Sequence, residues 1–364
     1  MTFTQAIGVI GGYGAVGSAV VRRLHRAGVG PLLVAGRDPA RADTLVEEVR
    51  ATGKGHGIEA ATVDLTDLGS LDAFAARCRL VVNCAGPSYR VLDAVAGAAL
   101  RRGADYVDAA GDDPAHARLH ADGGERRWTD AGRTAVFSAG ALPGLSGLLP
   151  RALIAGAAEP ARLDAYLGGV APLTPAAAGD VLLGRGPEHG TSAAAWENGR
   201  IRKRALEPRR GVRLDAFPKP VDAYPFLATE AARLAAATGI GQVRWYTVFG
   251  GTRFPEELTM AWAMDSDDTA DLVAAAEEDV KRLGAWYGQE FHVWERTGDG
   301  PPDRSLVLRA PDSYELSAFL TALASRQVLA GSVPPGVHFA ADVLDPARTV
   351  ESLASDPAAE LEIR

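Results

Sequence analysis

The stretch that most constrains this chain is residues 6–17, AIGVIGGYGAVG, in which an apolar run passes directly into glycines. The run indicates a buried strand, and the residues from Val16 to Ala27 place apolar side chains at helical spacing. A strand, a tight turn and a helix N-terminus in this order suit a pyrophosphate, because the free N–H groups and the dipole of the helix face the phosphates. The stretch therefore predicts a dinucleotide-binding unit.

Each glycine of this GxGxxG pattern has an expected task. We expect Gly12 to allow the sharp turn, Gly14 to let a diphosphate approach closely, and Gly17 to let the helix pack on the strand. The pattern alone also occurs in turns without a ligand, but its place between a strand and a helix favours the cofactor interpretation. The predicted cofactor contacts of this stretch are Gly12, Tyr13, Gly14, Ala15 and Val16.

The end of the second predicted strand, residues 31–37, selects the cofactor. An NAD-binding unit usually carries an acidic residue there, which holds the ribose 2′-hydroxyl, but this chain has Gly36 and then Arg37. A guanidinium suits a 2′-phosphate through paired hydrogen bonds and charge. We therefore predict NADP(H) over NAD(H), with the alternative that Arg37 is solvated and Asp38 holds the ribose. We expect Asp38 instead to cap the next helix.

Strands and helices alternate over residues 7–139. Further strands are predicted at 60–65, 80–86, 105–111 and 134–139, each preceded by a helical pattern. This alternation indicates an α/β fold with a doubly wound parallel sheet of the Rossmann type. Ligands of such sheets bind in the crevice outside the carboxyl ends of the strands.

Residues at those strand ends are therefore candidate cofactor contacts. Asp64 and Leu65 end the third strand, where Asp64 meets the adenine edge or forms an ordinary turn. Small residues end the fourth strand, and we expect them along the nicotinamide half of the cofactor, with strand-end packing as the alternative. They are Asn83, Cys84, Ala85, Gly86 and Pro87.

Composition bounds the partners. The net charge of −8 argues against a general nucleic-acid or anionic-membrane binder, since these need a basic surface. No apolar run approaches the length of a membrane span, and the first strand begins close to Met1, so we expect a cytoplasmic protein without a signal peptide. Two cysteines make no disulfide framework, and the scattered histidines predict no catalytic metal.

Five motifs, in their order and spacing, carry a family resemblance: GGYGAVG (11–17), AGRDPARA (35–42), VVNCAGP (81–87), YVDAAGD (106–112) and AGALPGLSGLL (139–149). The chain resembles the saccharopine dehydrogenase-like family of NAD(P)-dependent oxidoreductases. The resemblance implies a cofactor domain interrupted by a second domain, with C-terminal helices that return to the first. It also implies hydride transfer at carbon, usually to an imine, although some relatives resemble trans-acting enoyl reductases.

We accordingly expect three parts: a dinucleotide-binding domain (1–145), an α+β substrate and dimerisation domain (146–315), and C-terminal helices on the first domain (316–364). Alternating stretches after Leu163 predict a largely antiparallel sheet in the second domain. Helices are predicted at 266–287 and 313–330.

The second half offers substrate contacts. Pro143 and Gly144 precede an apolar helix, so that Ser146 and nearby N–H groups lie at a helix N-terminus suited to a substrate carboxylate. A nucleophilic serine is disfavoured, because Leu148 stands where the G-x-S-x-G pattern needs glycine. The basic segment 200–213 is either a solvated hairpin or dimer edge, or recruits an acidic substrate or carrier.

The sequence thus favours an NADPH-dependent reductase of a C=N or carbonyl group in a small amino-acid-like substrate, in a homodimer. The alternatives are an enoyl reductase on a carrier-bound chain and an NADP(H)-binding sensor without turnover. The chain must provide a proton route, and the candidate donors near the edge of the sheet are Tyr89, Asp108, Asp112 and His116. The alternative for Asp108 is a structural role. The alternative for Tyr89 is that it packs on the cofactor.

Overall fold

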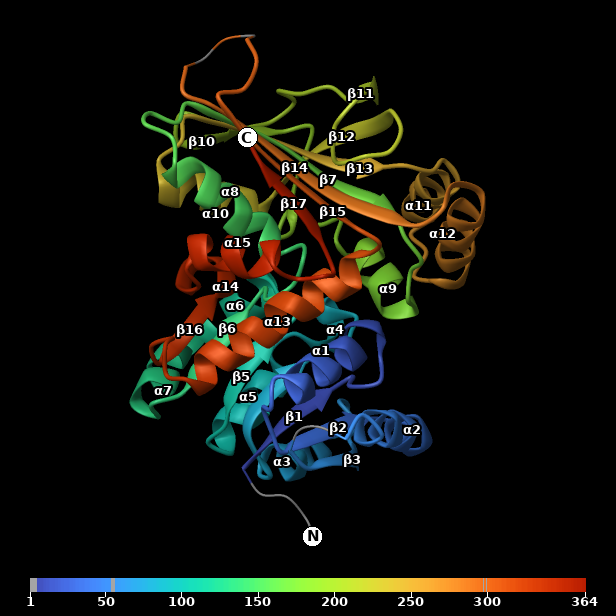
Figure 1. The fold of residues 1–364 in the computed structure, drawn as a ribbon, viewed down its shortest axis with the longest axis vertical. Helices are drawn as coiled ribbons and strands as arrows, with labels where there is room; N and C mark the ends of the chain where they lie inside the picture. Colours follow the sequence, from blue (N-terminus) through green and yellow to red (C-terminus); the bar gives the residue numbers. More distant parts are fainter. Residues whose placement is uncertain (1–4, 54–55, 297, 299) are drawn as a thin grey trace. The chain divides into compact units, whose positions relative to one another are not determined.

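The structure, a computed structural model, describes residues 5–53, 56–296, 298 and 300–364 (Figure 1). Two units divide the chain: one runs to Leu145 and includes Tyr314–Leu344, and the other comprises Ser146–Ser313 and Asp345–Arg364. We predicted that all of 316–364 joins the first unit. The last twenty residues instead belong to the second unit, because strand β17 (Glu360–Ile363) pairs with β15 (Arg304–Ala310).

The first unit contains a seven-stranded sheet in the order β16-β6-β5-β4-β1-β2-β3, and every pair is parallel. The predicted doubly wound sheet is confirmed, and its order reverses between β1 and β4. Strand β16 was not predicted; it pairs with β6 and follows a connection through the second unit. The strands are β1 (Ala6–Ile10), β2 (Leu32–Gly36), β3 (Ile58–Thr62), β4 (Cys78–Asn83), β5 (Asp105–Asp108), β6 (Thr134–Phe137) and β16 (Gly336–Phe339).

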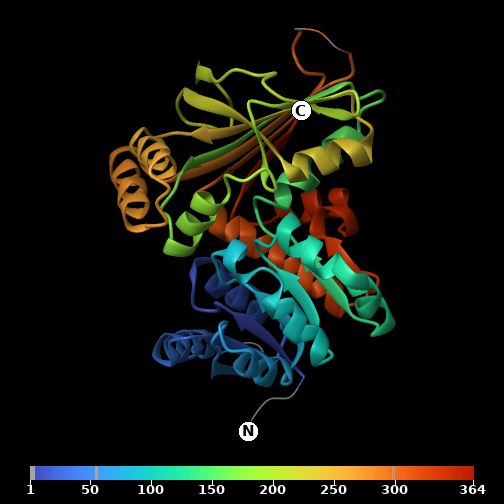
Figure 2. The ribbon, with the colours of Figure 1, turned by 180° about the vertical axis from the view of Figure 1, so that it is seen from behind.

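Helices cover both faces of this sheet, with α1 and α13 on one face and α5 on the other (Figures 1 and 2). Helix α1 begins immediately after the glycines and buries Val20 and Leu24. Arg23 of α1 pairs with Glu315 of α13 at 3.0 Å. The helices are α1 (Ala15–Arg26), α2 (Pro39–Arg50), α3 (Leu68–Ala75), α4 (Ser88–Val91), α5 (Ala94–Arg101), α6 (Asp113–His120), α7 (Gly124–Asp130), α13 (Ser313–Leu329) and α14 (Ala340–Val343), with a 3-10 turn at Ala121–Gly123.

The second unit contains a ten-stranded sheet whose main order is β10-β9-β13-β7-β14-β15-β17. The predicted largely antiparallel pairing is confirmed, with the one exception that β7 and β13 run parallel. Besides β15 and β17, the strands are β7 (Arg162–Val170), β8 (Gly190–Ser192), β9 (Ala195–Glu197), β10 (Arg200–Arg202), β11 (Arg209–Val212), β12 (Val221–Ala228), β13 (Gln242–Phe249) and β14 (Trp286–Trp294).

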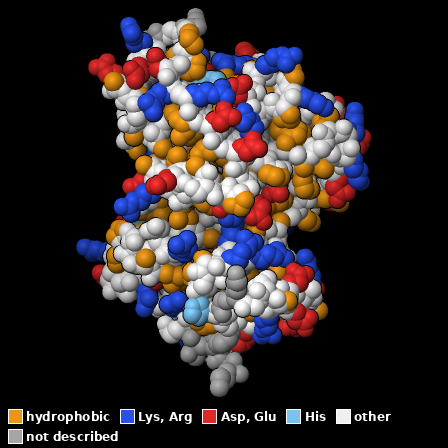
Figure 3. All heavy atoms as spheres, viewed as in Figure 1, with side chains coloured by type: hydrophobic (Ala, Val, Ile, Leu, Met, Phe, Trp, Pro, Cys, Tyr) orange, Lys and Arg blue, Asp and Glu red, His pale blue; other side chains and the backbone are white. Residues whose placement is uncertain are grey.

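The helices of the second unit correct one prediction. We predicted a helix at 266–287, but α12 (Ala270–Leu283) ends before Gly284, whose φ of +76° ends the helix, and Tyr287 lies in β14. The other helices are α8 (Leu145–Ala155), α9 (Pro175–Leu183), α10 (Thr229–Thr238), α11 (Arg253–Ala263) and α15 (Pro346–Ala354). Within the described residues, none of the helices is both long and apolar enough to span a membrane. Basic and acidic side chains are interspersed over the face drawn in Figure 3.

Candidate cofactor and active site

The glycine turn after β1 is shaped by close backbone approaches. Gly11 has a φ of +70°, which places it in the left-handed region that favours glycine. We expected Gly12 to allow the sharp turn, but Gly11 is the residue that does so. Gly12 is needed for space, since a Cβ there would lie 2.8 Å from the carbonyl oxygen of Val9. A Cβ on Gly17 would collide with the carbonyl oxygen of Gly11, which explains why α1 can begin so close to β1. The N-terminus of α1 therefore lies directly beside the backbone of the glycine turn. A pyrophosphate site requires this arrangement, because the N–H groups at the start of the helix bind the phosphates.

Tyr13 joins this turn to the end of β2. Its hydroxyl accepts a hydrogen bond from the backbone N–H of Asp38 at 2.8 Å. Its ring fills the space beside Gly36, where a Cβ would lie 2.5 Å from the phenol oxygen. The guanidinium of Arg41 lies over the ring, 4.7 Å from its centroid. The structure therefore brings together two predicted cofactor contacts, Tyr13 and Gly36, with an arginine that can face a phosphate.

Asp38 caps α2, as we predicted. Its Oδ1 accepts hydrogen bonds from the N–H groups of Ala40 (3.0 Å) and Arg41 (3.2 Å). This bonding engages Asp38 with its own helix, whereas Arg37 next to it is exposed. A guanidinium at the end of β2, beside a carboxylate that caps a helix, fits a ribose 2′-phosphate.

Asp64 forms a turn after β3. Its Oδ1 accepts bonds from the N–H (2.9 Å) and the hydroxyl (2.8 Å) of Thr66. These bonds, aided by the charge of Arg37, hold the pKa of Asp64 below its usual value. Asp64 therefore stays ionised close to Arg37, while Leu65 packs half-buried against the core. Their contact with adenine stays a prediction.

The ends of β4 and β5 share a buried hydrogen-bond network around Asp108, which is 2% exposed. Asp108 Oδ2 accepts from Asn83 Nδ2 (3.1 Å) and from the Tyr106 hydroxyl. Its Oδ1 accepts from the N–H groups of Ala110 (2.9 Å) and Gly111 (2.7 Å). Burial, together with the charge of Asp108, raises the pKa of Tyr106. Accepting all four bonds at once requires a carboxylate, so Asp108 is built to position its neighbours.

Through Asn83, the network reaches the small residues that we predicted along the cofactor. Asn83 Oδ1 accepts from the N–H of Ala85 at 3.2 Å, and the N–H of Cys84 donates to the carbonyl of Ile10 at 2.9 Å. A Cβ on Gly11 would lie 2.8 Å from the nitrogen of Ala85, so this segment packs directly on the glycine turn. Burial raises the pKa of the Cys84 thiol, which therefore stays protonated. Gly86 is exposed and Pro87 precedes α4.

The remaining candidate proton donors lie in different surroundings. His116 stacks between His120 and Phe339, with ring centroids at 4.1 Å from each. Burial lowers its pKa to about 4, so the imidazole is neutral at pH 7. Asp112 is buried and lies 3.5 Å from the hydroxyl of Ser138, and Tyr89 is half-buried on α4.

The predicted substrate contacts belong to both units. Pro143 accepts a backbone hydrogen bond from Gly140, and Gly144 is buried with a φ of +129°. In the second unit Ser146 is fully buried, and its hydroxyl donates to Glu230 Oε2. Their roles toward a substrate stay predictions.

Glu230 on α10 is a residue that our sequence analysis missed. It is 2% exposed, and its charge adds to the burial that raises the pKa of Tyr287 to about 12. Tyr287 accepts a hydrogen bond from Gln289 at 3.1 Å, so a polar cluster lies buried in the second unit. A signal was present: Glu230 stands on the helical stripe with Ala231, Leu234 and Ala235, which is otherwise apolar.

Comparison with known proteins addresses the cofactor. Residues 7–136 match the family model of the saccharopine dehydrogenase NADP binding domain. The matched segment contains the glycine turn, Arg37 and the Asp108 network. Residues 7–136 thus resemble a saccharopine dehydrogenase-type NADP-binding domain. NADP(H) is therefore the cofactor, as Gly36 and Arg37 predicted, and the family resemblance of the sequence is confirmed.

Beyond the NADP-binding domain, the fold is also shared. Saccharopine dehydrogenase (L-Glu forming) from Saccharomyces cerevisiae, in its apo form, aligns with a TM-score of 0.68 and 17% identity, over 98% of this chain and 99% of that chain. Short-chain dehydrogenase/reductases from Mycobacterium ulcerans (TM-score 0.28, 19% identity, 37% of this chain and 69% of that one) and Serratia marcescens (0.29, 16%, 37% and 73%) align too weakly to support inference. Curated proteins gave no match.

The NADP-binding domain and the fold together support an NADP-dependent oxidoreductase. Among the residues that the structure describes, no group of three or more histidine, cysteine or acidic side chains is placed to hold a metal ion.

Proposed function

We propose that this protein is an NADPH-dependent reductase of a C=N bond, or of a carbonyl that condenses with an amine, in a small amino-acid-like substrate. The observation that carries the proposal is the buried carboxylate of Glu230, which accepts a hydrogen bond from the hydroxyl of Ser146 and lies in a buried polar cluster with Tyr287 in the second unit. Burying a carboxylate costs roughly several kcal/mol, so a chain that places one in its interior has a use for it. Recognition of a polar, amine-bearing substrate is a function that accounts for such a residue.

Bound NADPH supplies a hydride, and the chain supplies alignment and a proton. In the first unit the glycine turn and Arg37 bind the phosphates, while Asp108 orients Asn83 and thereby Ala85. Reduction of a C=N bond places the hydride on carbon and a proton on nitrogen. We assign Asp108 to positioning, because its carboxylate already accepts four hydrogen bonds. Tyr89 and Asp112 stay candidate donors.

The test measures NADPH oxidation with pairs of amino acids and 2-oxo acids or aldehydes. We expect turnover with at least one pair, and we expect Glu230→Gln to raise KM for the substrate while NADPH affinity is unchanged. The matched control is Glu351→Gln, because Glu351 is exposed on α15 of the same unit and its substitution should leave both quantities unaffected. NADPH binding without oxidation by any pair contradicts the proposal.

The same assay separates the alternatives. Oxidation of NADPH by an enoyl thioester, and by no amine and carbonyl pair, identifies an enoyl reductase. Tight NADPH binding without turnover on either class of substrate identifies a sensor.

A further inference from the structure

Two segments of the second unit carry large formal charges of opposite sign. The basic arm, residues 200–213, contains seven arginine and lysine residues and one acidic residue. The acidic hairpin, residues 253–283, consists of α11, α12 and their connection, and contains nine acidic and three basic residues. The two formal charges are therefore +6 and −6, in a chain whose net charge is −8. Opposite charge of equal size on one unit calls for a structural explanation.

Each segment also exposes hydrophobic side chains amid its charges. On the acidic hairpin, Met260 is 55% and Met264 66% exposed, one helical turn apart, and Trp262 is 39% exposed. They include two of the three methionines in the chain. On the basic arm, Ile201 is 43% exposed between two exposed arginines of β10. Exposed apolar groups rimmed by charge are typical of interaction surfaces, and methionine adapts to varied partners.

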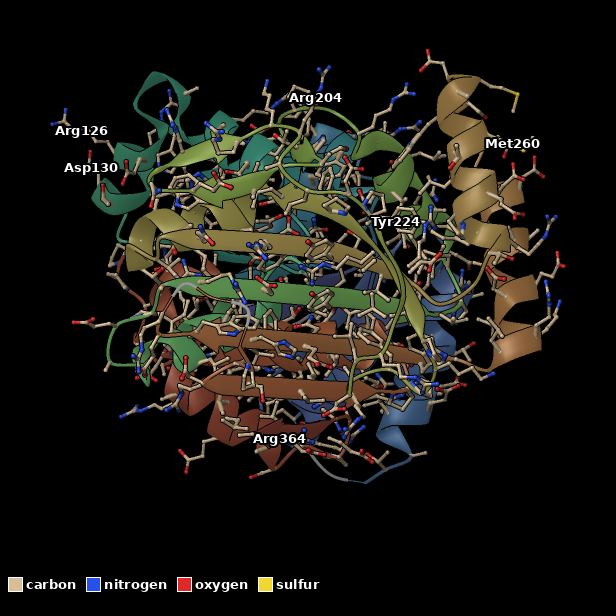
Figure 4. The ribbon with its side chains drawn as sticks, turned by 90° about the horizontal axis from the view of Figure 1, so that it is seen from above. Arg126, Asp130, Arg204, Tyr224, Met260 and Arg364 are labelled. Carbon is tan, nitrogen blue, oxygen red and sulfur yellow. The ribbon has the colours of Figure 1, made fainter. Side chains whose placement is uncertain are left out.

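The two segments lie apart within one copy. Figure 4 labels Arg204 of the basic arm and Met260 of the acidic hairpin, and the two side chains project from separate places on the unit. Ion pairs within the chain neutralise part of each segment. In the basic arm, Arg202 lies 3.5 Å from Glu197 and Arg210 lies 2.6 Å from Asp222. In the acidic hairpin, Arg253 pairs with Glu278 at 3.2 Å and with Glu256 at 3.1 Å, and Lys281 pairs with Glu277 at 3.6 Å. A second molecule can therefore reach both segments.

We propose that two copies of this chain associate through these segments, with the basic arm of each copy on the acidic hairpin of the other. A two-fold dimer satisfies both contacts at once, because each contact between segments i and j is repeated as j and i. Ile201 then meets the exposed methionines inside a rim of opposite charges. Charge complementarity with a second copy distinguishes this partner from an acidic carrier, which would leave the acidic hairpin unused.

The experiment measures oligomeric state by sedimentation at about 10 µM protein, in about 50 mM and about 500 mM salt. We expect a dimer that weakens at high salt. The arm variant Arg202→Glu/Arg204→Glu and the hairpin variant Glu256→Lys/Glu277→Lys should each weaken dimerisation about tenfold or more, because each variant lowers the formal charge of its segment from six to two and so weakens the attraction. The matched control is Arg126→Glu, because Arg126 is exposed on α7 in the first unit.

Mixing the two variants is the decisive step. In a mixed dimer, the altered arm meets the altered hairpin and the two native segments, with their full opposite charges, meet each other, so we expect dimers to return. Thermal melting and NADPH binding of each variant check that the fold is intact. A monomeric wild type, variants that stay dimeric, or folded variants that stay monomeric when mixed would each overturn the proposal. Larger assemblies would replace the closed dimer with an open chain and overturn it too.

Discussion

The carboxylate of Asp108 organises the ends of two neighbouring strands, and Asp108→Asn tests this role with a change of one atom. The two oxygens of Asp108 accept four hydrogen bonds, two from backbone N–H groups and two from side chains. An asparagine can keep the two backbone bonds only by turning its NH₂ toward Asn83 and Tyr106. The Tyr106 hydroxyl can rotate to accept, but the NH₂ of Asn83 cannot.

A rotation of the Asn83 amide does not remove this conflict between two facing NH₂ groups. If Asn83 flips its amide, its NH₂ turns toward the N–H of Ala85, which now donates to Asn83 Oδ1 at 3.2 Å. One buried donor is thus left without an acceptor in either arrangement, which costs about 1–3 kcal/mol. The remaining bonds also lose their charge-assisted strength. We therefore expect Asp108→Asn to lower the free energy of unfolding by about 3 kcal/mol.

The assay is urea unfolding, together with titration of NADPH by its fluorescence. We expect weaker NADPH binding as well, because the conflict displaces the backbone of Ala85 next to the glycine turn. The control is Asp43→Asn, since Asp43 is exposed on α2. A variant as stable as wild type, with unchanged NADPH affinity, would refute a positioning role for Asp108.

Three further predictions concern the NADP-binding domain. Arg37→Ala should weaken NADPH binding about 10- to 100-fold and leave NADH unaffected, because a charge-assisted hydrogen bond to the 2′-phosphate is worth about 1.5–3 kcal/mol; equal losses for both cofactors would contradict this. Gly17→Ala should cost about 2 kcal/mol or more in urea unfolding, since its Cβ meets the carbonyl of Gly11. Because the folded pKa of His116 is lowered to about 4 from 6.5, its neutral form favours folding at neutral pH. Stability should therefore fall as pH drops from about 6.5 toward 4, and His116→Phe should flatten that dependence.

The sequence predicted most of the first unit because its signals are local. Apolar runs, the GxGxxG spacing and the cap at Asp38 each involve residues a few positions apart. The seventh strand, β16, escaped prediction because its four residues are short and reach β6 only after the whole second unit intervenes. The helix predicted at 266–287 ran too far, since Gly284 was not recognised as its end.

The site was predictable as a set of positions but not as a set of partners. Asn83 and Asp108 were both named from strand ends, yet the bond between them joins residues 25 positions apart. Which residue acts on the substrate and which one holds another in place depends on such distant pairs. Glu230 was not named at all, because an acidic residue in an alanine-rich helix is normally expected to face solvent. Its burial becomes predictable only when its position is compared with the apolar residues on the same side of the helix.

Gly36 carries a last prediction about how the cofactor is chosen. The place of Gly36 is where NAD-binding domains carry an acidic residue, and here the ring of Tyr13 occupies the space that a side chain would need. The exclusion of an acid is thus a matter of packing as well as charge. We expect Gly36→Asp alone to disturb folding without gaining NADH affinity, because its Cβ would meet the phenol at 2.5 Å. In a Tyr13→Ser background the same substitution should fold and shift preference toward NADH, measured as the ratio of the two dissociation constants. If Gly36→Asp behaves alike in both backgrounds, Tyr13 does not control this position.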